Sequence, residues 1–519
     1  MEKNLFWADQ VAEEVIKQHK KKILVCAAGI SPSGTIHFGN FRELITVDLV
    51  VRALKDRGKK VRFIYSWDDY DRFRKTPANI PKEFDKYIGM PYCFIPDPFD
   101  CHKNYAEHFE KIFEESIARV GIKPEFIRQN ERYMKCVYAK EISHALKNKN
   151  IIIKILNKYR KDPLPDDWLP LEVFCEKCKS DFTRIINYDG EYSLSYECRC
   201  GYKNTIDFRK KGIVKLLWRV DWPMRWAYED VSFEPGGKEH STPGGSRTTG
   251  EEIVERVWKK KAPVYKKYEY IILKGVGGKM SGSLGNVITV DEVLGVYEPE
   301  IVRYFFAGTR PDAEFFVSFD TDVLKVYEDF DMCERIYFEK QKAKNEKERI
   351  QQKRVYEMSA INIPKKLPIQ PSFRHLTNLL QIHGSNFDKI KEYFREEIKD
   401  EDDLKRLKAR AERASNWINK HASDDFRFVV QKTVPKGLKL EEKQKQALHL
   451  VAKILKEREF DEVGLHEEFY RICKELDLDI KEFFKVAYLV LLAKEKGPKL
   501  ANFILTVGKD KVVRMFEKV

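Results

Sequence analysis

The strongest constraint on the fold of this chain is a strand-turn-helix-strand pattern near its beginning. Residues 22–28 form a short apolar run, Lys-Ile-Leu-Val-Cys-Ala-Ala, which is typical of a buried parallel strand. A turn rich in Gly, Ser and Pro follows at 29–34, a helical pattern covers about 38–55, and residues 60–67 have the pattern of a second strand. This βαβ unit predicts an α/β fold with a doubly wound, Rossmann-type parallel sheet.

The turn between the first strand and the helix carries residues suited to binding phosphate. Residues 32–40 read Pro-Ser-Gly-Thr-Ile-His-Phe-Gly-Asn. A helix start presents backbone N–H groups and the positive end of the helix dipole to an anion. His37 and Asn40 lie three residues apart, so both can face one ligand, and Gly39 leaves room for a base or ribose. The alternative is a helix cap in which His37 has no role in binding.

A second glycine-rich segment, residues 277–286, carries one lysine and two serines. Its sequence is Gly-Gly-Lys-Met-Ser-Gly-Ser-Leu-Gly-Asn. We expect a mobile loop that closes over bound phosphates, with Lys279 following the charge that develops on a leaving group. Alone, this segment fits any exposed glycine loop. Paired with residues 32–40, it predicts a nucleotide-binding site.

Together the two segments resemble signatures of the class I aminoacyl-tRNA synthetases. Residues 32–40 are similar to their His-x-Gly-His/Asn signature, with Asn40 at the second His position, and residues 279–283 are similar to their Lys-Met-Ser-Lys-Ser loop. Gly282 replaces the second lysine of that loop, which leaves Lys279 as the candidate for the pyrophosphate. Within the class, the chain resembles the archaeal-type lysyl group through the loop, a cysteine-rich insertion and the segment Gly-Gly-Lys-Glu-His at 236–240.

The resemblance implies an ATP-dependent ligase that joins lysine to tRNA(Lys), with Mg²⁺ accompanying ATP. It implies catalytic roles for His37, Asn40 and Lys279. The expected ATP-binding residues are Pro32, Ser33, Gly34, His37, Gly39, Asn40, Lys279, Met280, Ser281 and Ser283. Two alternatives stay open: a class I synthetase for glutamate or arginine, and a non-catalytic zinc-containing RNA-binding protein built on a synthetase scaffold.

A pocket for the amino acid is expected at the carboxyl ends of the parallel strands, where doubly wound sheets bind ligands. A lysine ammonium needs acidic or other acceptor groups, and aromatic walls favour a cation. Strands are expected at 216–221 and 268–273, and their ends carry acidic and aromatic residues. Trp222 and Tyr268 could equally be core aromatics. The predicted substrate-binding residues are Gly29, Asp221, Trp222, His240 and Tyr268.

Two clusters of cysteine, histidine and aspartate predict structural zinc sites. Four cysteines form two knuckles, Cys175-x2-Cys178 and Cys198-x-Cys200, which suit a tetrahedral zinc ion. A second cluster lies at Asp97, Cys101, His102 and His108, and Asp100 is the other carboxylate that could complete it. The alternative for the second cluster is a polar loop around a buried cysteine.

Charge points to a polyanionic partner. The 519 residues include 96 Lys and Arg against 82 Asp and Glu, a net charge of +14, and nucleic acid is the commonest partner of so basic a protein. A heavily charged, solubilised surface, as in a protein from a hot environment, would have the same composition. We expect a cytoplasmic protein, because the N-terminus has no signal pattern and no apolar run is long enough to span a membrane. We also expect it to be a monomer.

The order of motifs predicts four regions. Residues 1–90 form the first half of the catalytic domain, and 91–212 form an inserted region with the zinc modules, in which 105–155 are helical. Residues 213–324 complete the catalytic domain and carry the Lys-Met-Ser loop. Glycine becomes rare after about residue 321, so 325–519 are expected to be helical, and the resemblance implies that they form the anticodon-binding domain. Its end, at 497–508, is similar to that of bacterial-type glutamyl-tRNA synthetases.

Overall fold

The computed structural model describes residues 6–275 and 287–519, and its contacts divide the chain into two compact units. The first unit comprises Met1–Leu294, Pro299–Val317 and Glu339–Ile363. The second unit comprises Gly295–Glu298, Ser318–Phe338 and Pro364–Val519. Among the described residues, no helix has the length and apolar character that crossing a membrane requires.

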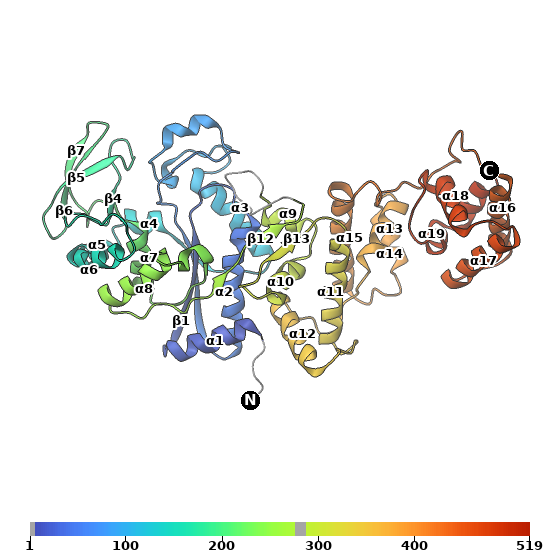
Figure 1. Ribbon diagram of the computed structural model, residues 1–519, viewed down its shortest axis with the longest axis horizontal. Coiled ribbons are helices and arrows are strands. Elements are labelled where there is room, and N and C mark those ends of the chain that lie inside the picture. The colour runs from blue at the N-terminus through green and yellow to red at the C-terminus, as the bar shows by residue number, and fades with distance from the viewer. Residues whose placement is uncertain (1–5, 276–286) are drawn as a thin grey trace. The chain divides into compact units, whose positions relative to one another are not determined.

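A four-stranded parallel sheet forms the centre of the described first unit (Figure 1). Its order is β3 (Glu125–Arg128), β2 (Lys60–Trp67), β1 (Ile23–Ile30) and β9 (Val231–Phe233). Helix α2 (Phe38–Asp56) joins β1 to β2, and α1 (Trp7–Gln18) packs against α2. The apolar middle of β1 is buried, as a strand covered on both faces requires. The predicted α/β fold with a parallel sheet is therefore confirmed.

Three predicted elements differ from the structure. The strand expected at 216–221 is wrong, because β8 (Val214–Leu216) ends there, pairs antiparallel with β4 (Leu171–Val173), and is followed by helix α7 (Trp218–Tyr228). An apolar aromatic run does not distinguish a strand from a buried helix start. The strand expected at 268–273 is two short strands, β11 (Lys267–Tyr268) and β12 (Ile271–Leu273). The stretch 105–155 is helical except for β3, which joins the central sheet.

Short elements complete the first unit. Strand β10 (Gly236–Gly237) pairs with β11, and β13 (Phe315–Val317) pairs with β12, both in parallel. A three-stranded antiparallel sheet contains β5 (Thr183–Tyr188), β6 (Ser193–Cys198) and β7 (Lys203–Asp207). The helices are α3 (Tyr105–Arg119), α4 (Gln129–Met134), α5 (Ala139–Lys147), α6 (Lys149–Asn157), α8 (Ser246–Val257), α9 (Val290–Leu294), α10 (Pro299–Gly308) and α12 (Glu346–Ser359), with single turns η1 (Lys82–Tyr87), η2 (Tyr92–Phe94) and η3 (Lys238–Ser241).

The second unit is helical, as the sequence predicts. Buried Arg410, in α15, forms ion pairs with Glu298 at 2.7 Å and with Asp331 of α11 at 2.8 Å. These pairs join α15 to the first two chain segments of the second unit. The helices α16 to α20 share one apolar core. The helices are α11 (Asp322–Tyr337), α13 (Phe373–Ile382), α14 (Phe387–Tyr393), α15 (Glu401–Lys420), α16 (Glu442–Glu457), α17 (Glu462–Glu475), α18 (Ile480–Leu492), α19 (Leu500–Val507) and α20 (Lys509–Phe516).

Buried Arg42 holds α2 against the chain that flanks β12 and β13. Its guanidinium donates to the carbonyl oxygens of Tyr270 at 3.1 Å, Pro311 at 2.8 Å and Ala313 at 2.6 Å. Burial lowers the pKa of Arg42 to about 10. One side chain thus supplies the donors for several carbonyl groups that no regular strand satisfies.

We expect Arg42→Ala to lower the free energy of unfolding by about 3 kcal/mol, since the hydrogen bonds that the buried guanidinium donates to these carbonyl groups would be lost. The measurement is urea unfolding of the protein, followed by the tryptophan fluorescence of the first unit. Arg349→Ala is the control, because Arg349 forms an exposed ion pair with Glu346 that is worth only about 0.5 kcal/mol. Equal losses in the two variants would contradict the role of Arg42.

Candidate active site

The turn that follows β1 is fixed by contacts with distant segments. The Ser31 hydroxyl donates to the Asp71 carboxylate at 2.8 Å, and the Tyr105 hydroxyl donates to the Ser33 carbonyl at 3.0 Å. Pro32 and Gly34 lie in the same turn, before α2 begins. The turn is therefore preorganised before any ligand arrives.

His37 is the cap of α2, and Asn40 lies in its first turn. The His37 backbone N–H donates to Asn40 Oδ1 at 3.1 Å, so the Asn40 side chain takes part in the cap. Its amide N–H₂ group keeps the capacity to donate to a ligand. Gly39, between them, is half-buried. His37 and Asn40 therefore lie together at the start of α2.

The Lys-Met-Ser segment falls outside the described residues. This applies to Lys279, Met280, Ser281 and Ser283. The chain that follows the segment reaches the helix start, because the Phe38 N–H donates to the Ile288 carbonyl at 2.7 Å. The start of α2 is therefore in contact with the chain that directly follows the second segment predicted from the sequence.

A pocket of about 80 Å³ opens at the carboxyl ends of β1, β2 and β9. Three of the predicted substrate-binding residues line it: Gly29, Trp222 and His240. Trp222 stacks on Trp218 with a centroid separation of 5.1 Å, and the His240 ring lies 5.6 Å from the Trp222 ring. The structure thus brings together residues that are about 200 positions apart in the chain.

Gly29 is needed because β1 and β2 approach closely at this position. A Cβ atom at Gly29 would lie 2.7 Å from the Ser66 carbonyl oxygen. The Gly29 N–H donates to Glu43 at 3.1 Å, and the Tyr268 hydroxyl donates to the other Glu43 oxygen at 2.7 Å. Tyr268 therefore acts on the pocket through Glu43, which itself lines the wall.

Asp221 lies behind the pocket wall. It is buried in α7, accepts a hydrogen bond from the Tyr133 hydroxyl and pairs with Arg225 Nε at 3.2 Å. Arg225 lines the pocket and pairs with Asp68 at 2.6 Å. Asp221 is therefore placed to orient Arg225, and it is not among the residues that line the pocket.

The acidic lining residues are the main feature that sequence reasoning missed. Glu43, Asp68 and Glu234 are among the lining residues, and Glu234 accepts hydrogen bonds from the indoles of Trp222 at 3.1 Å and Trp226 at 2.5 Å. Burial raises the pKa of Glu43 to about 8 and also raises the pKa of Asp68 and Glu234. The described hydrogen bonds to Glu43 and Glu234 come from neutral donors, although Arg225 and Arg247 offset part of the charge of Glu234. A small cation would find acidic acceptors here.

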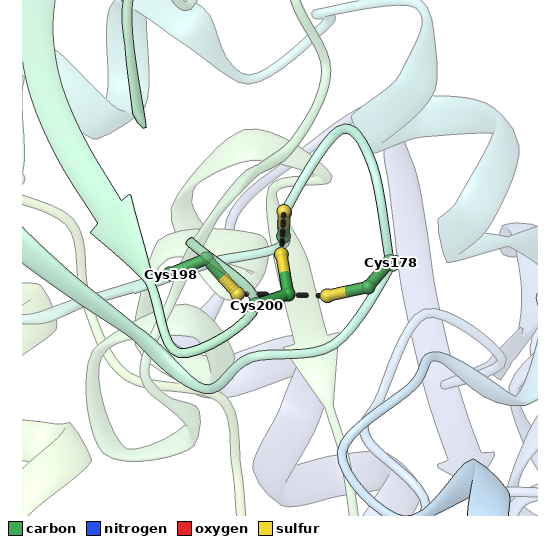
Figure 2. A group of neighbouring side chains, drawn as sticks. Cys178, Cys198 and Cys200 are labelled. Carbon is green, nitrogen blue, oxygen red and sulfur yellow. Dashed lines mark hydrogen bonds between the residues drawn. The ribbon is translucent and has the colours of Figure 1, made fainter. Parts of the chain in front are cut away.

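The four knuckle cysteines converge in the small antiparallel module. The sulfur atoms of Cys175 and Cys200 are 3.7 Å apart, and those of Cys178 and Cys198 are 3.5 Å apart. Figure 2 shows the side chains of Cys178, Cys198 and Cys200 pointing toward one another. Sulfurs bound to one zinc at about 2.3 Å in a tetrahedron lie about 3.8 Å apart, so the cluster fits that ion.

The second cluster also converges. Cys101 Sγ lies 3.1 Å from His102 Nδ1 and 3.3 Å from His108 Nδ1, and an Asp97 oxygen lies 3.3 Å from His108 Nδ1. Asp97, and not Asp100, belongs to the group whose ligand atoms lie within 4.8 Å of one another. Asp97 also accepts the backbone N–H groups of Cys101 and His102, which closes the loop around it.

Comparison with known proteins agrees with this geometry. A model of the tRNA synthetases class I (K) matches residues 5–362, and a model of an anticodon binding domain matches residues 387–519. The chain is 44% identical to a lysine-tRNA ligase of Borreliella burgdorferi over 100% of its length and 99% of the relative's. It is 43% identical to the lysine-tRNA ligase of Treponema pallidum (99% and 98% covered) and 42% identical to that of Pyrococcus furiosus (98% of each). The chain therefore belongs to the class I (K) family of tRNA synthetases.

Proposed function

We propose that this protein is a lysine-tRNA ligase. The carboxylate of lysine attacks the α-phosphorus of ATP and displaces pyrophosphate, and the terminal ribose hydroxyl of tRNA(Lys) then attacks the acyl carbon and releases AMP. The observation that carries the proposal is the acidic, tryptophan-walled pocket at the carboxyl ends of the sheet, beside the capped start of α2. Full-length relatives named lysine-tRNA ligase support the same substrate.

The pocket's charge favours lysine over glutamate. Two buried carboxyl groups, Glu43 and Glu234, accept only neutral donors among their described hydrogen bonds, so an anionic side chain would be repelled by either group in its ionised form. The ε-ammonium of lysine supplies the missing cation, and the faces of Trp218 and Trp222 suit a cationic side chain.

At the nucleotide end, the turn and the first residues of α2 bind ATP. His37 and the Asn40 amide hold its phosphates, with backbone N–H groups of the helix start. Pro32, Ser33, Gly34 and Gly39 shape the surface for the nucleotide. From the loop, Lys279 stabilises the leaving pyrophosphate, with Met280, Ser281 and Ser283 as further contacts. Mg²⁺ accompanies ATP and neutralises part of its phosphate charge.

The charging reaction tests the function directly. We expect lysine to be attached to tRNA(Lys) with a kcat/KM on the order of 1,000-fold above arginine or glutamate, because a site built around charged acceptors rejects a mismatched head group strongly. The measurement is aminoacylation with each radiolabelled amino acid in turn. Charging with arginine or glutamate in preference to lysine would reject the substrate, and no charging with any of them would favour a non-catalytic RNA-binding protein.

Glu43 makes lysine binding depend on pH. Below its pKa of about 8 the carboxyl is largely protonated, and an ammonium binds the ionised form better. The dissociation constant of lysine should therefore fall as pH rises from about 6.5 to 8.5, by up to about tenfold. Calorimetry at several pH values measures this. The dependence should flatten in Glu43→Gln and persist in the exposed control Glu346→Gln; an unchanged profile in Glu43→Gln would exclude Glu43 as an ammonium acceptor.

We further propose that both ligand clusters bind zinc and stabilise the fold. Purified protein should contain two zinc ions per chain by elemental analysis. Cys178→Ser and His108→Ala should each retain one ion, since each removes one ligand from a different cluster. Cys136→Ser is the matched control, because Cys136 lies outside both clusters. A single ion in the wild-type protein, lost in only one of the two variants, would eliminate the other site.

A further inference from the structure

A buried lysine, Lys215, lies between the turn after β1 and the amino-acid pocket. It belongs to β8, which pairs with β4 in a two-stranded sheet apart from the central one. Its side chain is only 3% exposed. Burying an ammonium group costs free energy, and apolar side chains of similar volume often fill such a place with equal or greater stability. The position of this charge therefore needs an explanation beyond stability.

On one side, Lys215 is bound to the turn after β1 through a single carboxylate. Lys215 Nζ lies 2.7 Å from Asp71 Oδ1. The other oxygen of that carboxylate, Asp71 Oδ2, accepts the hydrogen bond of the Ser31 hydroxyl at 2.8 Å. The two contacts use different oxygen atoms, so Asp71 makes both at once. The position of Lys215 is thereby passed on to the turn that holds the ATP phosphates in the proposed function.

On the other side, Lys215 lies behind a wall of the amino-acid pocket. Its Nζ lies 4.0 Å from Asp221 Oδ2, the same oxygen that pairs with Arg225 Nε at 3.2 Å. Arg225 lines the pocket, and there it donates to Ser66 Oγ at 2.9 Å and to Asp68 at 2.6 Å. Asp221 is therefore held between two cations, of which one lies in the pocket wall and the other is Lys215.

The charges of this network are shielded from solvent. Burial by itself would lower the pKa of Lys215, but attraction by Asp71, Asp221 and Glu172 raises that pKa above its ordinary value. Glu172 is the residue opposite Lys215 in the register of β4 and β8. Lys215 therefore keeps its positive charge, and salt screens such buried contacts much less than exposed ones.

We propose that Lys215 is a positioning residue that fixes the turn after β1 and the amino-acid pocket at the separation that the reaction needs. The inference rests on the proposed function, in which the carboxylate of lysine attacks the α-phosphorus of ATP. The reacting atoms belong to two ligands that different segments hold, and a misplacement of about 1 Å can cost on the order of 100-fold in rate. Lys215 is not among the residues that line the amino-acid pocket, and it acts through Asp71 and Asp221.

The first test compares rate with affinity. The rate is that of lysine attachment to tRNA(Lys) in a single turnover with saturating ATP and lysine, and we expect Lys215→Met to lower it about 100-fold. The dissociation constants of lysine and of ATP, measured by calorimetry, should each rise less than about threefold, because the hydrogen bonds within the turn and within the pocket wall remain. A loss of affinity for either ligand as large as the loss of rate would overturn the proposal, since Lys215 would then shape only one site.

Arg303→Met is the matched control for stability. Arg303 is also a buried cation of the first unit, paired with Asp48 at 2.6 Å, and it does not line the amino-acid pocket. Thermal unfolding followed by circular dichroism should show that both variants are destabilised, whereas Arg303→Met should keep the wild-type rate within about threefold. An equal loss of rate in the two variants would attribute the effect to lost stability and contradict the proposal.

A double-mutant cycle tests the connection in a protein that keeps Lys215. Ser31→Ala changes the turn and Asp221→Asn changes the pocket wall, and the two positions are joined through Asp71 and Lys215. We expect the single-turnover rate of the double variant to differ by at least about fivefold from the product of the two single effects, whereas unconnected sites give effects that multiply. Effects that multiply would overturn the proposal even if Lys215→Met does not fold. A wild-type protein that charges no lysine would reject the proposed function and this inference together, whereas lysine charging with independent effects would reject the inference alone.

Discussion

The pocket depends on the close approach of β1 and β2 at Gly29. The absence of a side chain there lets the Gly29 backbone lie against Ser66, and its N–H reaches the Glu43 carboxylate from inside the sheet. Tyr268 holds the other oxygen of the same carboxylate. Helix α2, strands β1 and β2 and the distant Tyr268 are thereby held together around the Glu43 carboxylate, and the other residues that line the pocket surround this group.

Burying an ionised carboxylate costs free energy unless a positive charge offsets it. The acidic residues of the pocket differ in how far their charge is offset. Asp68 has Arg225 as its partner, and Asp221 steadies that arginine from behind. Glu43 and Glu234 have only neutral donors among their described hydrogen bonds, and burial raises their pKa. Part of the desolvation cost therefore persists in the free protein and is relieved when a cation binds, so that the substrate completes the site.

The sequence predicts features carried by local spacing and misses those assembled across the chain. The apolar run at 22–28, the helix from about residue 38 and the Cys175 and Cys198 knuckles are local patterns, and the structure places each in the expected kind of element or cluster. Asp68, directly after β2, could have been found by the rule that ligands bind at carboxyl strand ends. Glu43 could not, since it lies mid-pattern in a helix.

Residues around the central sheet also show that contacts between distant segments cannot be predicted from local patterns. The partner of Glu43, Tyr268, is 225 positions away, and no local signal links them. Asp221 and Trp222 were expected at a strand end, but α7 carries them, because the aromatic run beginning at Trp218 fits either element. The helix turns Trp222 into the pocket and Asp221 behind it, so two neighbouring residues have different roles.

The most direct measurement is a crystal structure with a non-hydrolysable lysyl-adenylate analogue. We expect the lysine ammonium to lie within about 3.2 Å of a Glu43 or Glu234 oxygen, with the phosphate at the start of α2 beside His37 and Asn40. An analogue whose ammonium points to solvent, or which binds away from the carboxyl ends of β1 and β2, would contradict the account.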